Sequence, residues 1–217
     1  MADPATIWTL DWVPDGPRGF VRDLRLRWAC EETGTPYRME TVAFEDRHTN
    51  HLATQPFGQV PMLLDGDLRL FESGACLMHL ARKSDALIPQ GPAGEIEVLQ
   101  WVVAALNSIE MVSMPWVALK WSEQEFSVIT DWLGKRLDQM EAVLSEREWL
   151  VGDRFSAADL MMADVLRVDL IRKHGNRPAS EAFVARMTDR LAFRKAYADQ
   201  MAHFAAADAR REEVSHG

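Results

Sequence analysis

The hydrophobic pattern of the chain changes near residue 85, and this change constrains the fold more than any other feature. Before residue 85, short apolar runs alternate with helical patterns, whereas afterwards helical spacing continues almost unbroken to the end of the 217 residues. We therefore expect two domains, at residues 1–84 and 92–217, joined by a linker at 85–91. With 47% hydrophobic and 26% charged residues, the chain can bury a normal core.

The first forty residues predict a strand, a helix and a second strand. The run TIWTLDW at 6–12 is rich in β-branched and aromatic residues, as strands are. Val21, Leu24 and Trp28 follow at helical spacing, and that pattern stops at residues 33–34 with a Thr-Gly pair. The run YRMETVAF at 37–44 predicts the second strand, so we expect a βαβ unit with parallel strands.

The stretch GQVPMLLDGDLRLFESGA at 58–75 predicts a hairpin followed by a helix. Two short strands meet at Asp65-Gly66 or one residue beyond, and an Asp-Gly pair favours the positive φ of tight turns. Pro61 can open a strand that does not need its N–H, and a Val-Pro step can hold a cis peptide. Ser73 is placed at the N-cap or in the first turn of the next helix.

Charge and composition limit the partners. A formal net charge of −9 argues against binding nucleic acid or an anionic membrane, which both require clustered basic residues, so we expect a small-molecule partner. We expect neither a secretion signal at the N-terminus nor a segment long and apolar enough to span a bilayer. The two cysteines, Cys30 and Cys76, are expected to be buried and reduced, as in a cytoplasmic protein.

Two sequence motifs, one in each half of the chain, resemble those of the cytosolic glutathione transferase superfamily, of bacterial type. The first is the Val60-Pro61 step, the hairpin and then the Glu72-Ser73 pair. The second is VGDRFSAADLMMADVL at 151–166, where Ser156 and Asp159 fit the family's structural capping box. The resemblance covers nearly the whole chain and implies an α/β thioredoxin-like N-terminal domain followed by an all-α helical domain.

The resemblance also implies a glutathione site. Ser73 and the first N–H groups of its helix would bind the γ-glutamyl carboxylate, and Glu72 the ammonium group or a nearby base. The backbone of Val60, held by Pro61, would pair with the cysteinyl backbone, and Gln59 would reach the glycyl carboxylate. Asp-Gly hairpins and serine caps are common in proteins that bind nothing, so the family resemblance carries this assignment.

Thiol activation is the weakest part of the resemblance. Family members use a Tyr, Ser or Cys after the first strand, but DWVPDGPRGFVRD at 11–23 contains none of them. We expect the backbone N–H groups of Arg18, Gly19 and Phe20, at the start of the first helix, to face the thiolate. Arg18 or Arg22 would add a positive charge near the thiolate. The simpler alternative for each arginine is a position on a solvent-exposed helix face without a role in catalysis.

The implied reaction is conjugation of the glutathione thiolate to a small, largely apolar electrophile by a cytoplasmic homodimer. Three alternatives stay open: reduction of a disulfide or peroxide, glutathione or ligand binding without catalysis, and a subunit that only binds a protein partner. They differ in whether the loop at 11–23 lowers the thiol pKa and whether glutathione binds at all.

The helical half is expected to supply the electrophile pocket. A long helix from residue 92 would be kinked or ended by Pro115, with Met111 and Trp116 beside the pocket and Trp12 as its wall or as a core residue. The run at 207–217, ADARREEVSHG, predicts a fraying charged tail. The histidines do not have metal-ligand spacing, so no metal is expected; His48, Asn50 and His51 are candidates for contact with the glycyl end of glutathione.

Overall fold

A computed structural model describes residues 4–46, 49–89, 91–124 and 126–215. The chain divides into two compact units. The N-terminal unit comprises residues 1–83 together with 191–217, and the helical unit comprises residues 84–190. The sequence pattern places residues 191–217 in the second domain, whereas their contacts group them with the first.

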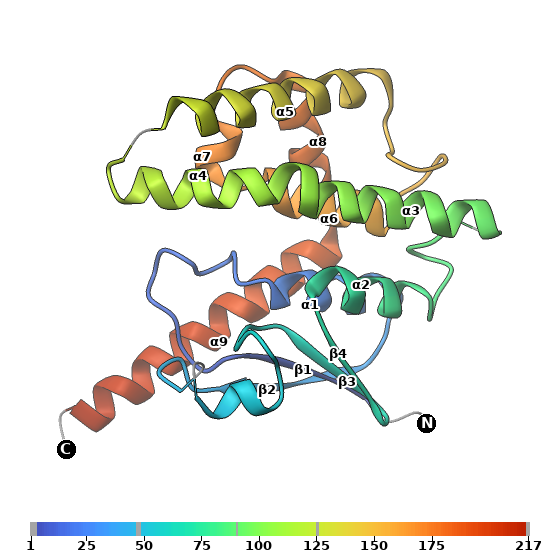
Figure 1. The fold of residues 1–217 in the computed structure, drawn as a ribbon. Coiled ribbons are helices and arrows are strands. Elements are labelled where there is room, and N and C mark those ends of the chain that lie inside the picture. The colour runs from blue at the N-terminus through green and yellow to red at the C-terminus, as the bar shows by residue number, and fades with distance from the viewer. Residues whose placement is uncertain (1–3, 47–48, 90, 125, 216–217) are drawn as a thin grey trace. The chain divides into compact units, whose positions relative to one another are not determined.

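The N-terminal unit contains the sheet that the sequence predicts. Its strands are β1 (Ala5–Leu10), β2 (Tyr37–Val42), β3 (Met62–Asp65) and β4 (Leu68–Phe71), in the order β2-β1-β3-β4. Strands β1 and β2 are parallel, as a helical crossover requires, and β3 is antiparallel to both β1 and β4. The thioredoxin-like arrangement of four strands with helices is confirmed (Figure 1).

Helices α1 (Asp23–Thr33) and α2 (Ser73–Ala81) pack against each other beside this sheet (Figure 1). The first ends where predicted, because Gly34 adopts the left-handed conformation at φ 67° and its N–H donates to the Cys30 carbonyl. The hairpin turn lies one residue beyond Asp65-Gly66, with Gly66 at φ 59°. A short 3₁₀ helix, η1 (Asn50–Ala53), precedes β3.

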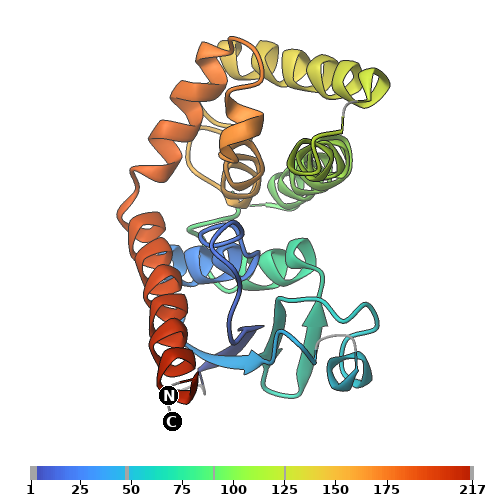
Figure 2. The same cartoon turned by 90° about the vertical axis from the view of Figure 1, so that its left-hand side faces the viewer.

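The last helix, α9 (Leu191–Ser215), is the long red helix on one side of the N-terminal unit in Figure 2, and it packs against α1. Gln200 is fully buried between them, and its Nε2 donates to Asp23 Oδ1 at 2.7 Å. Asp23 is itself completely buried, where it accepts a hydrogen bond from Arg27 at 2.6 Å, and burial raises its pKa. The expectation of a fraying tail after residue 207 is wrong, since the helix continues to Ser215.

The helical unit is built around one long apolar stretch that does not stop at Pro115. It passes from α3 (Pro92–Ala104) through a π-helical segment, η2 (Ala105–Glu110), into α4 (Met111–Trp121). The carbonyl that Pro115 cannot bond belongs to Met111, the first residue after the π segment, and the helix continues past this proline to Trp121. The remaining helices are α5 (Ser127–Glu146), α6 (Ala157–Leu166), α7 (Asp169–Arg172) and α8 (Pro178–Thr188).

Helix α6 forms the centre of this unit, because every residue from Ala157 to Leu166 is buried. Its capping box is present as predicted. The Ser156 N–H and hydroxyl donate to Asp159 Oδ2 at 2.9 and 2.8 Å, and the Leu150 N–H donates to Asp159 Oδ1 at 2.9 Å.

One expectation about membranes needs correction. The stretch Ala93–Trp121 is, by length and composition, long and apolar enough to cross a bilayer. The core helix of a folded unit passes the same test, and Val102, Ala105 and Val117 of this stretch are buried in the helical unit.

Candidate active site

Three segments of the N-terminal unit converge at one edge of its sheet. In the antiparallel pairings, Trp8 lies opposite Met62, and Met62 lies opposite Phe71. The residue before Met62 is Pro61, the residue after Phe71 is Glu72, and the loop that follows β1 leaves the sheet at the same edge. The structure thereby brings together the hairpin entrance, the start of α2 and the loop at residues 11–22.

The hairpin entrance is held by side chains from the preceding segment. The Val60–Pro61 peptide bond is cis, as the resemblance implies, and Pro61 is buried. The buried Gln55 accepts hydrogen bonds from the Phe57 and Gln59 N–H groups at 2.6 and 3.1 Å. The hydrogen bond to Gln55 fixes the backbone of Gln59, whereas the residue itself is exposed to solvent.

His51 makes a structural contact with the backbone of the hairpin entrance. It is 4% exposed, and its Nε2 lies 2.7 Å from the Gln59 carbonyl oxygen. His48 and the Asn50 side chain lie outside the residues that the structure describes. Over residues 4–46, 49–89, 91–124 and 126–215, no group of three or more His, Cys, Asp or Glu side chains could hold a metal ion.

Ser73 is the first residue of α2, as predicted, and Arg25 of α1 orients it. Arg25 is 2% exposed, and its Nη1 donates to Ser73 Oγ at 2.9 Å. Arginine has no acceptor, so Ser73 Oγ must accept in this bond and keeps its own proton for another acceptor. The pair therefore presents a hydroxyl donor, backed by a positive charge, beside the N–H groups of the first turn of α2.

Glu72 has a backbone conformation that costs energy. It lies at φ 67° and ψ 116° and caps α2, although it is not glycine. Non-glycine residues with positive φ persist where the surrounding structure holds them, and they concentrate at ligand sites. The backbone of Glu72 is thus held next to Ser73 at the sheet edge, and the residue is exposed there.

The loop at residues 11–22 does not present the row of open N–H groups that we expected. The Arg18 N–H donates to the Asp15 carbonyl at 3.0 Å, and the Phe20 N–H donates to the Pro17 carbonyl at 2.9 Å. Helix α1 begins only at Asp23, so these residues form turns before the helix. The sequence pattern does not distinguish two consecutive turns from a helix start, because both suit a Pro-Gly-rich segment.

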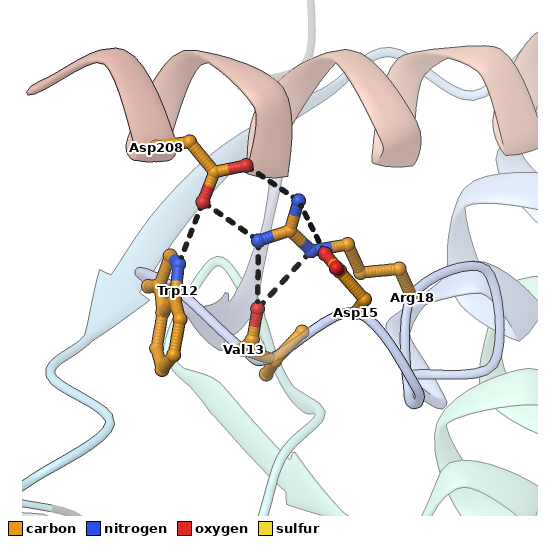
Figure 3. Close-up of polar contacts among 5 residues, drawn as sticks. All are labelled: Trp12, Val13, Asp15, Arg18 and Asp208. Carbon is orange, nitrogen blue, oxygen red and sulfur yellow. Dashed lines mark hydrogen bonds and ion pairs between the residues drawn. The ribbon is translucent and has the colours of Figure 1, made fainter. Parts of the chain in front are cut away.

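Arg18 lies in an ion pair, not on a solvated face. Its Nη1 and Nη2 donate to Asp208 Oδ2 and Oδ1 of α9 at 2.5 and 2.7 Å, in a two-pronged pair (Figure 3). Its Nε and Nη2 also donate to the Val13 carbonyl at 3.1 and 3.0 Å, and Asp15 lies 3.3 Å from Nη1. Hydrogen bonding to Asp208 raises the pKa of Arg18, and Arg18 lowers the pKa of Asp208 to about 2.

The other loop residues pack around this pair. Trp12 is half-buried, and its Nε1 donates to Asp208 Oδ1 at 2.8 Å (Figure 3). Gly19 lies at φ 77° against the Tyr197 ring, where a Cβ would be 2.6 Å from a ring carbon. Arg22 is the N-cap residue of α1. Trp12 therefore contacts α9 through a hydrogen bond, and Gly19 contacts it through close packing against Tyr197.

The two residues expected to line the electrophile pocket lie in the helical unit. Met111 is 53% exposed, whereas Trp116 is 5% exposed and its Nε1 donates to Thr130 Oγ1 at 3.1 Å. Both cysteines are buried, and burial raises the pKa of Cys30 and of Cys76 to about 12.

The sequence gives no sign of three residues that shape this edge. Arg25 appears as one of several charged residues on a helix, Gln55 as a polar loop residue, and Asp208 as part of a charged tail. Each acts on a partner that lies far away in the chain or on a backbone group, so no local pattern marks it. For Arg25, the structure adds that α1 is buried from Asp23 to Cys30, and charges in such a helix must find partners.

Comparison with known proteins identifies a family for both halves of the chain. Residues 16–82 match the glutathione S-transferase N-terminal domain, and residues 120–190 match the glutathione S-transferase C-terminal domain. The chain is 35% identical over 150 residues to glutathione S-transferase 1 of Zea mays, covering 63% of this chain and 70% of that protein.

Solved structures agree with this assignment. A glutathione transferase from Burkholderia graminis, with two glutathione molecules bound per subunit, is 25% identical with a TM-score of 0.75, over 89% of this chain and 87% of that one. The theta class enzyme from Xanthomonas axonopodis pv. citri, with glutathione bound, is 26% identical with a TM-score of 0.72, over 91% and 98%. On these matches, the chain belongs to the glutathione S-transferase family.

Proposed function

We propose that this glutathione transferase holds glutathione at the sheet edge where Val60–Pro61, Glu72 and Ser73 meet. The observation that carries the proposal is the Arg25–Ser73 hydrogen bond, which fixes a buried serine as a donor at the head of α2. The Burkholderia and Xanthomonas relatives hold glutathione in their structures, and this chain shares their family and fold.

Each end of glutathione has a complementary group. The γ-glutamyl carboxylate accepts from the Ser73 hydroxyl and the first-turn N–H groups of α2, with the Arg25 charge behind them. The γ-glutamyl ammonium pairs with the exposed carboxylate of Glu72. The cysteinyl backbone pairs with the Val60 backbone, and the exposed Gln59 side chain reaches the glycyl carboxylate.

The bound thiol then lies beside the loop that follows β1. There the thiolate attacks a small, largely apolar electrophile, which forms a carbon–sulfur bond and releases the leaving group. Trp12, in this loop, is the residue that we propose for contact with the electrophile; Met111 and Trp116 of the helical unit stay predictions of the sequence. We also propose that the protein acts as a cytoplasmic homodimer, as the family resemblance implies.

A titration of glutathione into wild type, Ser73→Ala and Thr33→Ala tests the clamp. Thr33 provides the matched control, because its hydroxyl also makes hydrogen bonds but lies at the far end of α1. A hydrogen bond to a charged group contributes about 1.5–3 kcal/mol, so Ser73→Ala should weaken binding roughly tenfold to a hundredfold. Thr33→Ala should bind like wild type.

The same titration, followed through the ultraviolet band of the thiolate against pH, separates catalysis from binding. An enzyme must lower the thiol pKa of bound glutathione below that of free glutathione. Binding with an unchanged thiol pKa would instead identify a protein that binds glutathione without activating it. Equal affinities of wild type and Ser73→Ala would refute the clamp.

A further inference from the structure

Helix α9 contacts the segment from β1 to α1 at successive points. This matters because that segment carries the loop beside the proposed thiol position. The contacts are His203 Nε2 with the Leu10 carbonyl (2.9 Å), the Tyr197 ring with Gly19, Gln200 Nε2 with the Val21 carbonyl (2.9 Å) and Lys195 Nζ with Glu31 (2.5 Å). One helix from the end of the chain therefore braces the loop and both elements that flank it.

Figure 3 shows the polar contacts that Asp208 of α9 makes with the loop at residues 11–22. Its carboxylate accepts three hydrogen bonds, one from Trp12 at the start of the loop and two from Arg18 near its end. Arg18 in turn donates twice to the Val13 carbonyl. The loop is thus closed on itself by Arg18 and fixed to α9 by Asp208.

The surroundings of Trp12 add to this bracing. The Arg211 guanidinium lies 4.3 Å from the centre of the Trp12 ring, and the Phe44 ring meets the indole edge-on at 5.7 Å. Arg211 also pairs with Glu45 at 3.2 Å. The indole is enclosed on several sides, and its N–H points to Asp208 (Figure 3).

We propose that Asp208 is a positioning residue for the transferase reaction, which holds the loop at residues 11–22 in the conformation that receives the glutathione thiol. The proposal rests on the proposed function, because it assumes that the thiol lies beside this loop. Asp208 acts through Trp12 and Arg18 and does not touch glutathione. The glutathione clamp at Val60, Glu72 and Ser73 belongs to other segments, so positioning and binding can be separated by mutation.

The test compares Asp208→Asn with two controls. Asparagine keeps the size of the side chain but loses the charge, and its amide group would face the donors of Arg18. Asp15→Asn removes the other carboxylate near Arg18, which is 96% exposed and makes no link to α9. Lys195→Gln removes a salt bridge of α9 that does not involve the loop.

The assay measures glutathione affinity, the thiol pKa of bound glutathione, and kcat with chlorodinitrobenzene, an activated aryl halide. We expect Asp208→Asn to bind glutathione within about twofold of wild type, to lose about tenfold or more in kcat, and to raise the bound thiol pKa. Trp12→Phe, which removes only one of the three hydrogen bonds, should show a smaller change in the same direction. Both controls should match wild type.

Three results would overturn the inference. One is an unchanged kcat and thiol pKa in both Asp208→Asn and Trp12→Phe. Another is an equal loss in Lys195→Gln, which would mean that docking of α9 as a whole matters and the loop contact does not. A lowered thiol pKa in Asp208→Asn would show that Arg18 acts on the thiolate directly. Failure of wild type to bind glutathione is a separate outcome, which would reject the proposed function and this inference with it.

Discussion

Removal of the Asp159 side chain should destabilise the helical unit more than any change at its exposed neighbours. The carboxylate is completely buried and accepts hydrogen bonds from two backbone N–H groups, those of Leu150 and Ser156, and from the Ser156 hydroxyl. Alanine would leave the two backbone donors buried without an acceptor. The hydroxyl can rotate to another partner, so it contributes less to the loss.

The size of the effect follows from these donors. An unsatisfied buried donor costs about 1–3 kcal/mol, so two cost about 2–6 kcal/mol. Part of this is offset, because burial of the carboxylate is unfavourable and raises the pKa of Asp159. We expect Asp159→Ala to lower the free energy of unfolding by about 3 kcal/mol and Tm by about 6–12 °C in a chain of this size.

Urea unfolding followed by circular dichroism measures the change, with Asp153→Ala as the matched control. Asp153 is exposed in the loop just before the capping box, so its removal should change stability by no more than about 0.5 kcal/mol. A loss below about 1 kcal/mol in Asp159→Ala, or an equal loss in both variants, would contradict this account of the box.

Three further predictions concern the N-terminal unit. Gly19→Ala should destabilise this unit by about 1–2 kcal/mol through the positive φ at residue 19, plus a further cost for the contact of the new Cβ with Tyr197. Tyr197→Ala in the same chain should remove only the cost of that contact. Fully additive effects of the two mutations on the free energy of unfolding would refute the contact. Cys30 and Cys76, with pKa values of about 12, should react with a thiol reagent only after unfolding, and rapid labelling of the native protein would contradict their burial. Because Arg18 lowers the folded-state pKa of Asp208 to about 2, the stabilisation by this carboxylate is present above its unfolded-state pKa of about 3.9 and is lost as the pH falls through about 2. The difference in urea midpoint between wild type and Asp208→Asn should therefore shrink between about pH 5 and pH 2, and a constant difference would count against the ion pair.

Local signals in the sequence were sufficient for the sheet and its helices. Gly34 marks the end of α1, the turn at Gly66 marks the hairpin, and Ser73 marks the start of α2. In each case one residue has a conformational or hydrogen-bonding property that its immediate neighbours do not share. Pro115 does not end its helix, and no sequence pattern announces the π segment that precedes α4.

Long-range partners explain the errors at the site. Arg18 has the charge and position expected of a residue that stabilises a thiolate, but its partner Asp208 lies 190 residues away in a stretch that looks like a tail. Arg25 meets Ser73 across 48 residues. The sequence predicts which residues can contribute charge near the sheet edge, while the packing of α1 and α9 decides where each charge is used.

The Arg18–Asp208 pair also limits how this loop can activate a thiol. A lone guanidinium about 5 Å from the sulfur, at an effective dielectric constant of about 20, would stabilise the thiolate by about 3 kcal/mol, or about two pKa units. A carboxylate in direct contact with the guanidinium opposes most of this effect. With Asp208 2.5 Å from Arg18 Nη1, the arginine is therefore a poor cation for the thiolate and a good anchor for the loop. Asp208→Asn separates the two roles by sign: release of the charge would lower the thiol pKa, whereas release of the loop would raise it.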